Sequence, residues 1–312
     1  MKKIFMLFAL GSISWHCMAQ EDIPPADTSW KKGGVIGLNF TQIALDNWAA
    51  GGQSSIAGTA LINVFANYKE GKVVWDNMLD LAYGINNFNN SPYWIKTDDK
   101  IDISSKLGRE AGNNWYYSGL INFKTQFSPG YLDPNAPPDQ RVLISDFMAP
   151  AYMLVALGMD YRPSDDFTVF ISPVTVKTTI VNNQTLADAG AFGVDEADIN
   201  ADGTIVPGTG SKIRAELGGY LKMMWRKRVM ENISFQTKLD LFSNYLEHPE
   251  NIDINWENLI AMKVNNLVSV TLATHLIYDH DIKIARDEGG VPRIGPTTQF
   301  KEVFNLGFNY KF

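Results

Sequence analysis

The most regular feature of this chain is the alternation of apolar and polar residues along short segments. It is clearest in the last segment, where the apolar series is Phe304, Leu306, Phe308, Tyr310 and Phe312, and the residues between are Asn305, Gly307, Asn309 and Lys311. A period of two places successive side chains on opposite faces of a β-strand. The pattern predicts an amphipathic strand that ends on its apolar face.

The same alternation recurs about twelve times along the chain, and helical spacing fits none of these segments better. One segment places Ile101, Ile103 and Leu107 on one face and charged residues on the other. Another segment slips register at Pro173, where a bulge would return Val174 and Val176 to the apolar face. The chain is therefore predicted to be all-β.

The connections between these segments alternate strictly between short and long. The short turns fall near residues 69–71, 109–113, 162–165, 226–231 and 265–266, and the longer, more polar loops span 45–54, 87–94, 128–150, 182–211, 243–252 and 279–299. Outer-membrane barrels have short periplasmic turns, long extracellular loops and an even number of strands. These features predict a transmembrane antiparallel up-and-down β-barrel of about 12 strands.

Aromatic residues gather near the short turns and the C-terminus. They are Tyr68, Trp75, Trp115, Tyr117, Tyr161, Phe167, Trp225, Phe235, Tyr310 and Phe312. Amphipathic rings suit the headgroup level of a membrane. Their distribution predicts an aromatic girdle at one rim of the barrel.

The N-terminal residues have the form of an export signal. Lys2 and Lys3 precede a short apolar run, and Cys17-Met18-Ala19 reads as a cleavage site. We predict a signal peptide over 1–19, a short periplasmic segment over 20–32 and the barrel over 33–312. Lipidation at Cys17 is disfavoured because the residues before it are bulky.

Composition limits the function further. Cleavage after residue 19 would remove the only cysteine and take the formal charge from −7 to −9. An acidic chain lacks the basic excess on which non-specific nucleic-acid binding relies, so no nucleic-acid partner is expected. After residue 19 no run of about 18 apolar residues exists, which argues against a membrane protein built of helices.

The polar faces of the predicted strands would line the lumen with charges of both signs. The candidate lumen residues are Asp76, Asp80, Lys96, Asp98, Lys100, Asp102, Lys212, Arg214, Glu216, Lys222, Lys238 and Asp240. Unpaired charges in a narrow interior are costly, so one interpretation is a structural core of ion pairs. The other is a small pore whose charges filter solutes.

Two motifs raise other possibilities. Asp198, Asn200 and Asp202 precede Gly203 in an Asp-x-Asn-x-Asp-Gly pattern that could bind Ca²⁺ weakly or form an ordinary acidic turn. His275 is predicted to point into the lumen, but no nucleophile motif or zinc-type histidine cluster accompanies it. We predict no enzymatic activity and no cofactor, apart from possible Ca²⁺ in that loop.

One segment is distinctive as a family signature. Asn47-Trp48-Ala49-Ala50-Gly51-Gly52, after the first predicted strand, together with Ala19-Gln20 and a terminal Phe312, resembles a domain-of-unknown-function family of outer-membrane β-barrel proteins from Bacteroidota. The resemblance implies an outer-membrane location, and no substrate or catalytic residue comes with it. Gly51 and Gly52 suit a tight turn, and Trp48 would anchor the hairpin or narrow the lumen.

The leading functional hypothesis is a structural barrel or a narrow passive pore for small polar solutes. The alternatives are a surface binding or adhesion protein that acts through its long loops, an enzyme, and a transporter of hydrophobic ligands, which would need an apolar pocket or a lateral gap. The expected partners are outer-membrane lipid and lipopolysaccharide. By analogy with other such barrels, the assembly machinery would recognise the strand that ends at Phe312.

Overall fold

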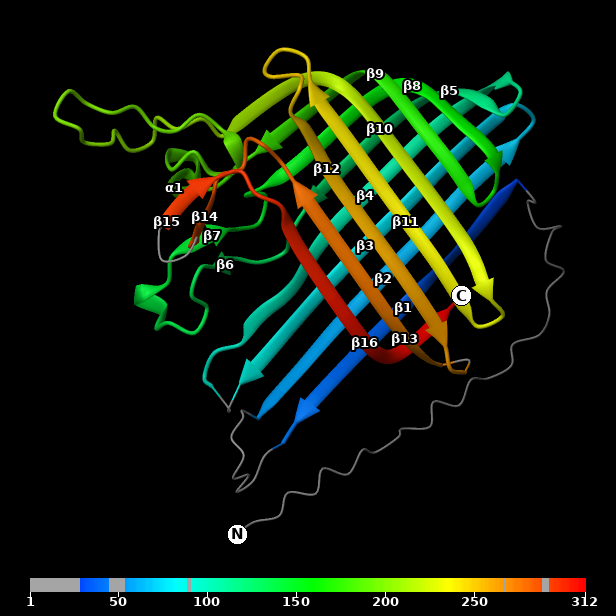
Figure 1. Cartoon of the computed structure of the whole chain (residues 1–312), viewed down its shortest axis with the longest axis horizontal. Helices are drawn as coiled ribbons and strands as arrows, with labels where there is room; N and C mark the ends of the chain where they lie inside the picture. Colours follow the sequence, from blue (N-terminus) through cyan, green and yellow to red (C-terminus); the bar gives the residue numbers. More distant parts are fainter. Residues whose placement is uncertain (1–28, 45–53, 89–90, 266, 288–291) are drawn as a thin grey trace, which may run out of the picture.

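Twelve antiparallel strands close into a barrel in the computed structural model, which describes residues 29–44, 54–88, 91–265, 267–287 and 292–312 (Figure 1). The barrel strands are β1 (Trp30–Ile43), β2 (Ser55–Glu70), β3 (Val73–Phe88), β4 (Ile95–Gly112), β5 (Trp115–Thr125), β8 (Ala151–Ser164), β9 (Phe167–Ile180), β10 (Ile213–Met230), β11 (Ile233–Asn244), β12 (Ile252–Lys263), β13 (Val268–Tyr278) and β16 (Gln299–Lys311). Each strand pairs with the barrel strands that precede and follow it, and β16 pairs with β1. The predicted twelve-stranded up-and-down barrel is confirmed.

The loops sort by length as the sequence predicts. In Figure 1 the short turns and the C-terminus lie at the right-hand end of the barrel, and the long loops lie at the left-hand end. The long loops hold two small hairpins, β6 (Gly130–Tyr131) with β7 (Leu143–Ser145) and β14 (Ile284–Asp287) with β15 (Pro292–Gly295), together with α1 (Gln184–Asp188) and the 3₁₀ turns Pro138–Gln140 and Ala191–Gly193. No helix among the described residues is long and apolar enough to cross a membrane.

Residues 1–28 and 45–53 lie outside the described part of the chain. The predicted signal peptide, most of the segment over 20–32, and the Asn47, Trp48, Gly51 and Gly52 motif fall within them. The first strand begins at Trp30, slightly before the predicted start of the barrel.

β9 has a bulge at Pro173, where its sequence predicts a shift of register. Leu157 pairs with Val174, but Met159 pairs with Ile171, so the pairing shifts register at this point. Proline has no N–H to donate to a ladder, which confines it to such irregular positions. The Ser172 Oγ lies 2.8 Å from the carbonyl oxygen of Leu157 and 2.9 Å from that of Val174, so both carbonyl oxygens are acceptors within reach of its one hydroxyl proton.

The outer face of the barrel is apolar and exposed. Large side chains that point outward include Ile36, Leu38, Phe40, Ile103, Leu107, Leu157, Ile171, Phe304, Leu306 and Phe308. Near the short turns, aromatic pairs join neighbouring strands: Trp30 lies 5.2 Å from Tyr68, and Trp115 lies 4.9 Å from Tyr161 between ring centroids. Trp225 and Phe235 form a third such pair at 5.9 Å.

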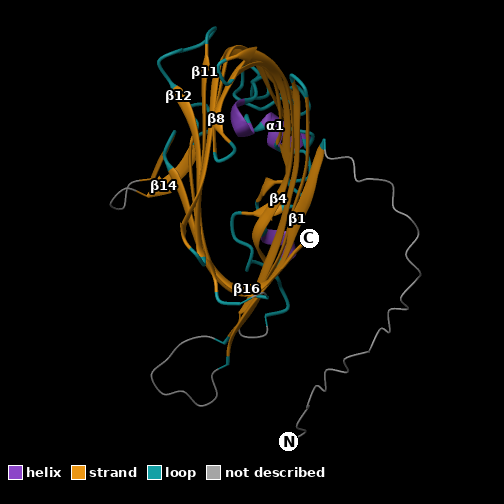
Figure 2. Ribbon diagram, turned by 90° about the vertical axis from the view of Figure 1, so that its right-hand side faces the viewer, coloured by secondary structure: helices purple, strands orange, loops and turns teal. Residues whose placement is uncertain are grey.

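Part of the interior is a packed apolar core rather than open space. Leu120, Ala156, Phe170, Tyr220 and Phe242 form a buried cluster on the inner face of β5 and β8 to β11. A second cluster lies at the long-loop end, where Leu186 and Ala187 of α1 pack on Ala149, Val181 and Val194. Figure 2 looks in from the short-turn end and shows α1 within the outline of an elongated ring.

Candidate functional site, a charged lumen

Acidic and basic side chains from almost every wall of the barrel meet in its interior. Because successive side chains of a strand alternate between faces, the outward apolar residues place their polar neighbours inside. Ten of the twelve candidate lumen residues take part in interior ion pairs: Asp76, Asp80, Asp98, Lys100, Asp102, Arg214, Glu216, Lys222, Lys238 and Asp240. The structure therefore brings most of the predicted set together.

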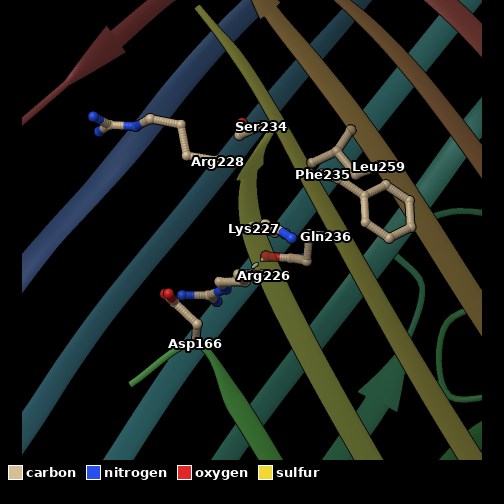
Figure 3. A pocket seen from close by; sticks show the side chains of 8 residues that line it. All are labelled: Asp166, Arg226, Lys227, Arg228, Ser234, Phe235, Gln236 and Leu259. Carbon is tan, nitrogen blue, oxygen red and sulfur yellow. Dashed lines mark hydrogen bonds between the residues drawn. The ribbon is translucent and has the colours of Figure 1, made fainter. Parts of the chain in front are cut away.

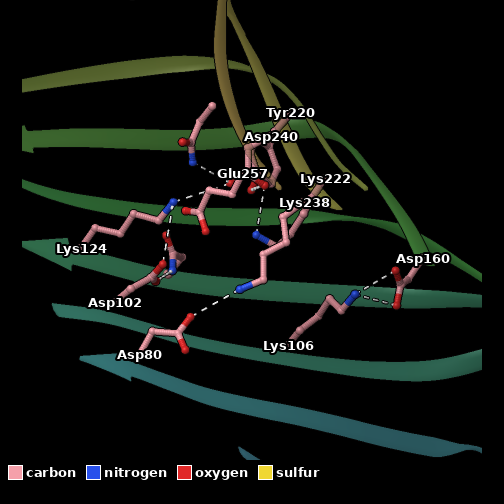
Figure 4. Close-up of polar contacts among 12 residues, drawn as sticks. Asp80, Asp102, Lys106, Lys124, Asp160, Tyr220, Lys222, Lys238, Asp240 and Glu257 are labelled. Atoms are coloured by element: carbon pink, nitrogen blue, oxygen red, sulfur yellow. Dashed lines mark hydrogen bonds and ion pairs between the residues drawn. The ribbon is translucent and has the colours of Figure 1, made fainter. Parts of the chain in front are cut away.

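Two ion pairs join strands on opposite sides of the ring. The Lys238 Nζ on β11 lies 3.4 Å from the Asp80 Oδ2 on β3. The Lys100 Nζ on β4 lies 3.5 Å from the Glu257 Oε1 on β12. Figure 4 shows the Lys238–Asp80 pair reaching from one wall to the other. These contacts cross the lumen and narrow it at mid-depth.

Asp240 on β11 is the most heavily contacted carboxylate of the network (Figure 4). Its Oδ1 accepts hydrogen bonds from the Tyr220 hydroxyl at 2.9 Å and from Lys222 at 3.0 Å. Its Oδ2 accepts from the Asn255 amide at 3.2 Å and lies 3.6 Å from Lys124 of β5. Charge-assisted bonds of this number fix the carboxylate in one position.

Asp160 on β8 forms the most buried part of the network. Its side chain is inaccessible to solvent and is bound by Lys106 at 2.9 Å and by the Arg162 Nε. Arg162 also lies 2.6 Å from Asp76, and the Lys106 ammonium lies 5.7 Å from the centre of the Phe170 ring. A buried charge of this kind is tolerated only when its partners are in place.

A third group of ion pairs lies on the inner wall near the long-loop end of the barrel. The Lys177 Nζ lies 2.7 Å from Asp253 and 3.3 Å from Asp279. Arg214 lies 2.7 Å from Asp281, and its Nη1 donates to the carbonyl oxygen of Gly193 at 3.1 Å. These bonds attach the loop segment that holds Gly193 to the inner wall.

Lys96 does not lie where alternation predicts. Gly84 pairs with Asp98 but Ile85 pairs with Lys96, so a bulge at Thr97 shifts the register. A bulge of one residue moves every side chain beyond it to the other face. Lys96 instead pairs with Asp99 at 2.9 Å and donates to the carbonyl oxygen of Ser128 at 2.8 Å, away from the lumen network.

Lys212 is the other predicted lumen residue that lies elsewhere. It precedes the first residue of β10, and its side chain is exposed at the long-loop end. Its carbonyl oxygen accepts from the Val181 N–H at 2.8 Å. The β9–β10 ladder begins at Ile213, so Lys212 lies just outside it, at the mouth of the barrel.

Some members of the network carry only a weak signal in the sequence. Arg162 is the first residue of a predicted short turn, and Asp279 and Asp281 lie in a predicted long loop, where polar residues are ordinary. Lys301 alternates with Phe300 and so could have been placed inside; it lies 3.0 Å from Asp98 on β4. Contacts between distant strands leave no local pattern.

The candidate Ca²⁺ residues form a hairpin turn in the long loop. The Asp202 Oδ1 accepts from the Thr204 hydroxyl and N–H at 2.6 and 3.0 Å, and these bonds lower the pKa of Asp202. The Asn200 side chain also donates to the Thr204 hydroxyl, at 3.0 Å, and Asp198 N–H donates to Thr209. In the part of the chain that is described, no three His, Cys, Asp or Glu side chains gather as a metal site. Ca²⁺ binding stays a prediction.

His275 does lie against the network, opposite Glu257 in the β12–β13 ladder. Its Nε2 contacts the amide oxygen of Asn255, whereas a nucleophilic pair would bring the ring to a serine or threonine hydroxyl. The expectation of no enzymatic activity stays a prediction.

A shallow pocket lies at the short-turn rim, where β10 ends. Figure 3 shows its lining residues, among them three consecutive basic side chains, Arg226, Lys227 and Arg228. Arg226 donates to the Gln236 side-chain oxygen at 2.8 Å, and its N–H donates to the carbonyl oxygen of Asp166 at 2.8 Å. The pocket is open to the surroundings and stands at the edge of the barrel.

Comparison with known proteins finds one family model that is similar to part of the chain. Residues 40–131 match the model of a family described as a protein of unknown function (DUF3078). The predicted resemblance to a domain of unknown function is thereby confirmed. Among curated proteins, none matches this sequence.

Solved structures with a similar course of the chain are β-barrels of low sequence identity. The translocator domain of autotransporter NalP from Neisseria meningitidis is 11% identical, with 91% of this chain and 89% of that chain covered and a TM-score of 0.38. An outer membrane channel from Pseudomonas putida F1 is 9% identical, with 93% and 100% covered and a TM-score of 0.38. At such scores the likeness assigns neither protein's role to this chain.

Proposed function

We propose that this chain is an outer-membrane β-barrel that acts as a narrow passive pore for small polar solutes. The apolar outer face and the aromatic pairs near the short turns support a membrane location, since lipid-facing strands carry an apolar band bounded by aromatic girdles. The polar inner face supports a water-compatible interior. Its passivity, with no cofactor and no catalysis, is part of the proposal.

The observation that carries the proposal is the pair of ion bridges between opposite walls. Lys238–Asp80 and Lys100–Glu257 both cross the lumen. A twelve-stranded barrel is wider than one filled entirely by side chains and narrower than a porin. With these bridges in place, the remaining path suits ions and small polar molecules rather than large solutes.

Single-channel recording in planar bilayers tests this function. We expect the native barrel to conduct weakly and the double variant Lys238→Ala/Asp80→Ala to conduct more, because it removes both ends of a bridge and leaves no unpaired charge. The matched control is His248→Ala/Glu250→Ala, which removes an exposed ion pair from a long loop. A native barrel that is silent, or a bridge variant that conducts like the control, would contradict the pore.

Cysteine labelling of intact cells tests the proposed orientation. We expect a membrane-impermeant maleimide to label Asp202→Cys, in an exposed long loop, on intact cells. Lys72→Cys, in an exposed short turn, should react only after the outer membrane is opened. Labelling in the opposite order would refute the proposed topology.

The expected partners follow from this location. Outer-membrane lipid and lipopolysaccharide would surround the apolar face, and the assembly machinery would recognise the strand that ends at Phe312. An origin in Bacteroidota rests on the sequence resemblance alone.

A further inference from the structure

The seam where the barrel closes is paired over only part of its length. The ladder between β1 and β16 consists of five residue pairs, from Val35 with Lys311 to Asn39 with Gly307. In contrast, β1 pairs with β2 along its whole length, from Trp30 to Ile43. Among the described residues no ladder pair joins Phe40–Ile43 to β16. The two strands diverge toward the long-loop end in Figure 1.

Reciprocal glycine and asparagine residues mark the point at which the pairing ends. Gly37 lies opposite Asn309, and Gly307 lies opposite Asn39. A Cβ atom at Gly307 would overlap the Asn39 Oδ1, and one at Gly37 would crowd the Asn309 Oδ1. The glycines thus leave room for each asparagine side chain to lie over the opposite strand. We call these four residues the clasp. Beyond this clasp, Phe40 to Ile43 are exposed on both faces of β1.

The divergent part lies at a level where the outer face is still apolar. Phe40 on β1 and Phe300, Phe304 and Leu306 on β16 are all more than half exposed. Glu302 is the one acidic residue among these outward positions of β16. If the barrel spans a membrane, this opening lies in the half of the bilayer nearer the long loops.

Open backbone at that level needs a polar environment. Strand edges facing hydrocarbon leave N–H and C=O groups without partners, and such backbone is tolerated in a membrane only when it is buried in protein or lines a water-filled cavity. The divergent seam therefore has to communicate with the lumen, because the lumen is the polar space beside it.

The inner wall around the seam differs from the rest of the lumen. At this depth the inward residues of β1, β2, β13 and β16 other than Lys301 and His275 are uncharged or apolar: Thr41, Ile43, Thr59, Leu61, Thr271, Ala273, Val303 and Asn305. The ion pairs described above lie mainly on β3 to β5 and β8 to β12. The Lys301 ammonium on β16 lies at this depth, and Asp98 on β4 pairs with it at 3.0 Å.

We propose that the divergent half of the β1–β16 seam is a lateral portal for neutral amphipathic molecules. A hydroxyl or amide head would bond the open backbone groups and Thr41 or Asn305, while an apolar tail would remain among the outward aromatic side chains. The portal lets such molecules pass between the lumen and the adjoining leaflet without crossing the ion bridges. The inference rests on the proposed membrane location but is independent of conduction through the lumen.

Paired cysteines measure whether the seam is open. Thr41→Cys/Asn305→Cys continues the β1–β16 register past the clasp, and Val35→Cys/Lys311→Cys is the matched control within the ladder. Position 41 lies six residues after position 35 on β1. In an antiparallel ladder an even separation gives the same side-chain face and the same type of residue pair, so the two cysteine pairs are comparable. The barrel is produced from Gln20 onward, which leaves no other cysteine. In lipid vesicles under mild oxidation, we expect a disulfide in the control and free thiols at Thr41→Cys/Asn305→Cys.

A photoreactive alcohol then tests the ligand class. The probe is azioctanol, a neutral alkanol that carries a diazirine, and adducts are located by mass spectrometry. We expect adducts on the inward residues Thr59 and Ala273. We expect these adducts to be lost when a bifunctional thiosulfonate links the two introduced thiols of Thr41→Cys/Asn305→Cys. The disulfide in the control should leave them unchanged.

Three results would overturn the portal. The first is oxidation of Thr41→Cys/Asn305→Cys as readily as the control, which would mean a closed seam. The second is a covalent dimer from Thr41→Cys alone, which would mean that a second copy covers the edge. The third is labelling of outward residues only. A barrel that is silent in planar bilayers but labels at Thr59 would refute the pore and retain the portal.

Discussion

We expect Asp160→Ala to lower the free energy of unfolding of the barrel by about 3–5 kcal/mol, the cost of breaking a buried ion pair from one side. The Asp160 carboxylate has no solvent access and binds both Lys106 and Arg162. Its removal leaves Lys106 buried beside the Phe170 ring without its closest anion. Urea unfolding in lipid vesicles, followed by tryptophan fluorescence, measures the loss.

The matched control is an ion pair that is open to solvent. Lys301 is 42% exposed and its partner Asp98 is 26% exposed. Exposed pairs contribute about 0–1 kcal/mol, so Lys301→Gln should barely change the unfolding midpoint. If assembly of Asp160→Ala fails altogether, Lys106→Met/Asp160→Ala removes the orphaned ammonium and should recover folded barrel. Equal unfolding midpoints in urea for Asp160→Ala and the control would mean that the buried ion pair does not stabilise the barrel.

A lysine introduced on the outer face should also lower the free energy of unfolding substantially. Leu157 lies at the middle of β8, points outward and is 62% exposed. If that face meets hydrocarbon, Leu157→Lys costs roughly 2–4 kcal/mol, the range for a lysine at the midplane of a barrel's lipid face. The same urea titration in vesicles gives the value.

Ile199→Lys is the control for this substitution. Ile199 is 63% exposed, close to the value for Leu157, but it lies in the hairpin of the long loop. We expect its stability to match that of the native chain. If Leu157→Lys leaves the free energy of unfolding unchanged, β8 does not face lipid, and the proposed membrane location is refuted.

The strands and their order could be predicted from the sequence because a two-residue period is a local property. The apolar series from Phe304 to Phe312 becomes the outward face of β16, and the slip at Pro173 becomes a bulge. Loop lengths were equally informative, because hairpin turns and long loops need no distant partner. The aromatic pairs near the short turns are formed by residues that the sequence places next to those turns.

The site could be predicted only in part because it depends on contacts between remote strands. Alternation placed Lys238 and Asp80 inside, but nothing local indicates that they meet across the ring. One extra residue at Thr97 sends Lys96 to the other face, and no glycine or proline in the neighbouring residues of β4 signals that bulge. The divergence of β1 from β16 depends on the closure of the whole sheet, which no single segment encodes.

The bridge between Lys238 and Asp80 has a consequence for assembly, since these residues are 158 positions apart in the chain. Each hairpin can form from neighbouring segments, but this bond cannot exist until the sheet has curled far enough to bring β11 against β3. Contacts of such long separation are made late and slowly. The charges would therefore stay hydrated on an open sheet and lose their water only as the ring closes. Closure of the barrel would then end with a dehydration step that stabilises only a sheet closed in the correct register.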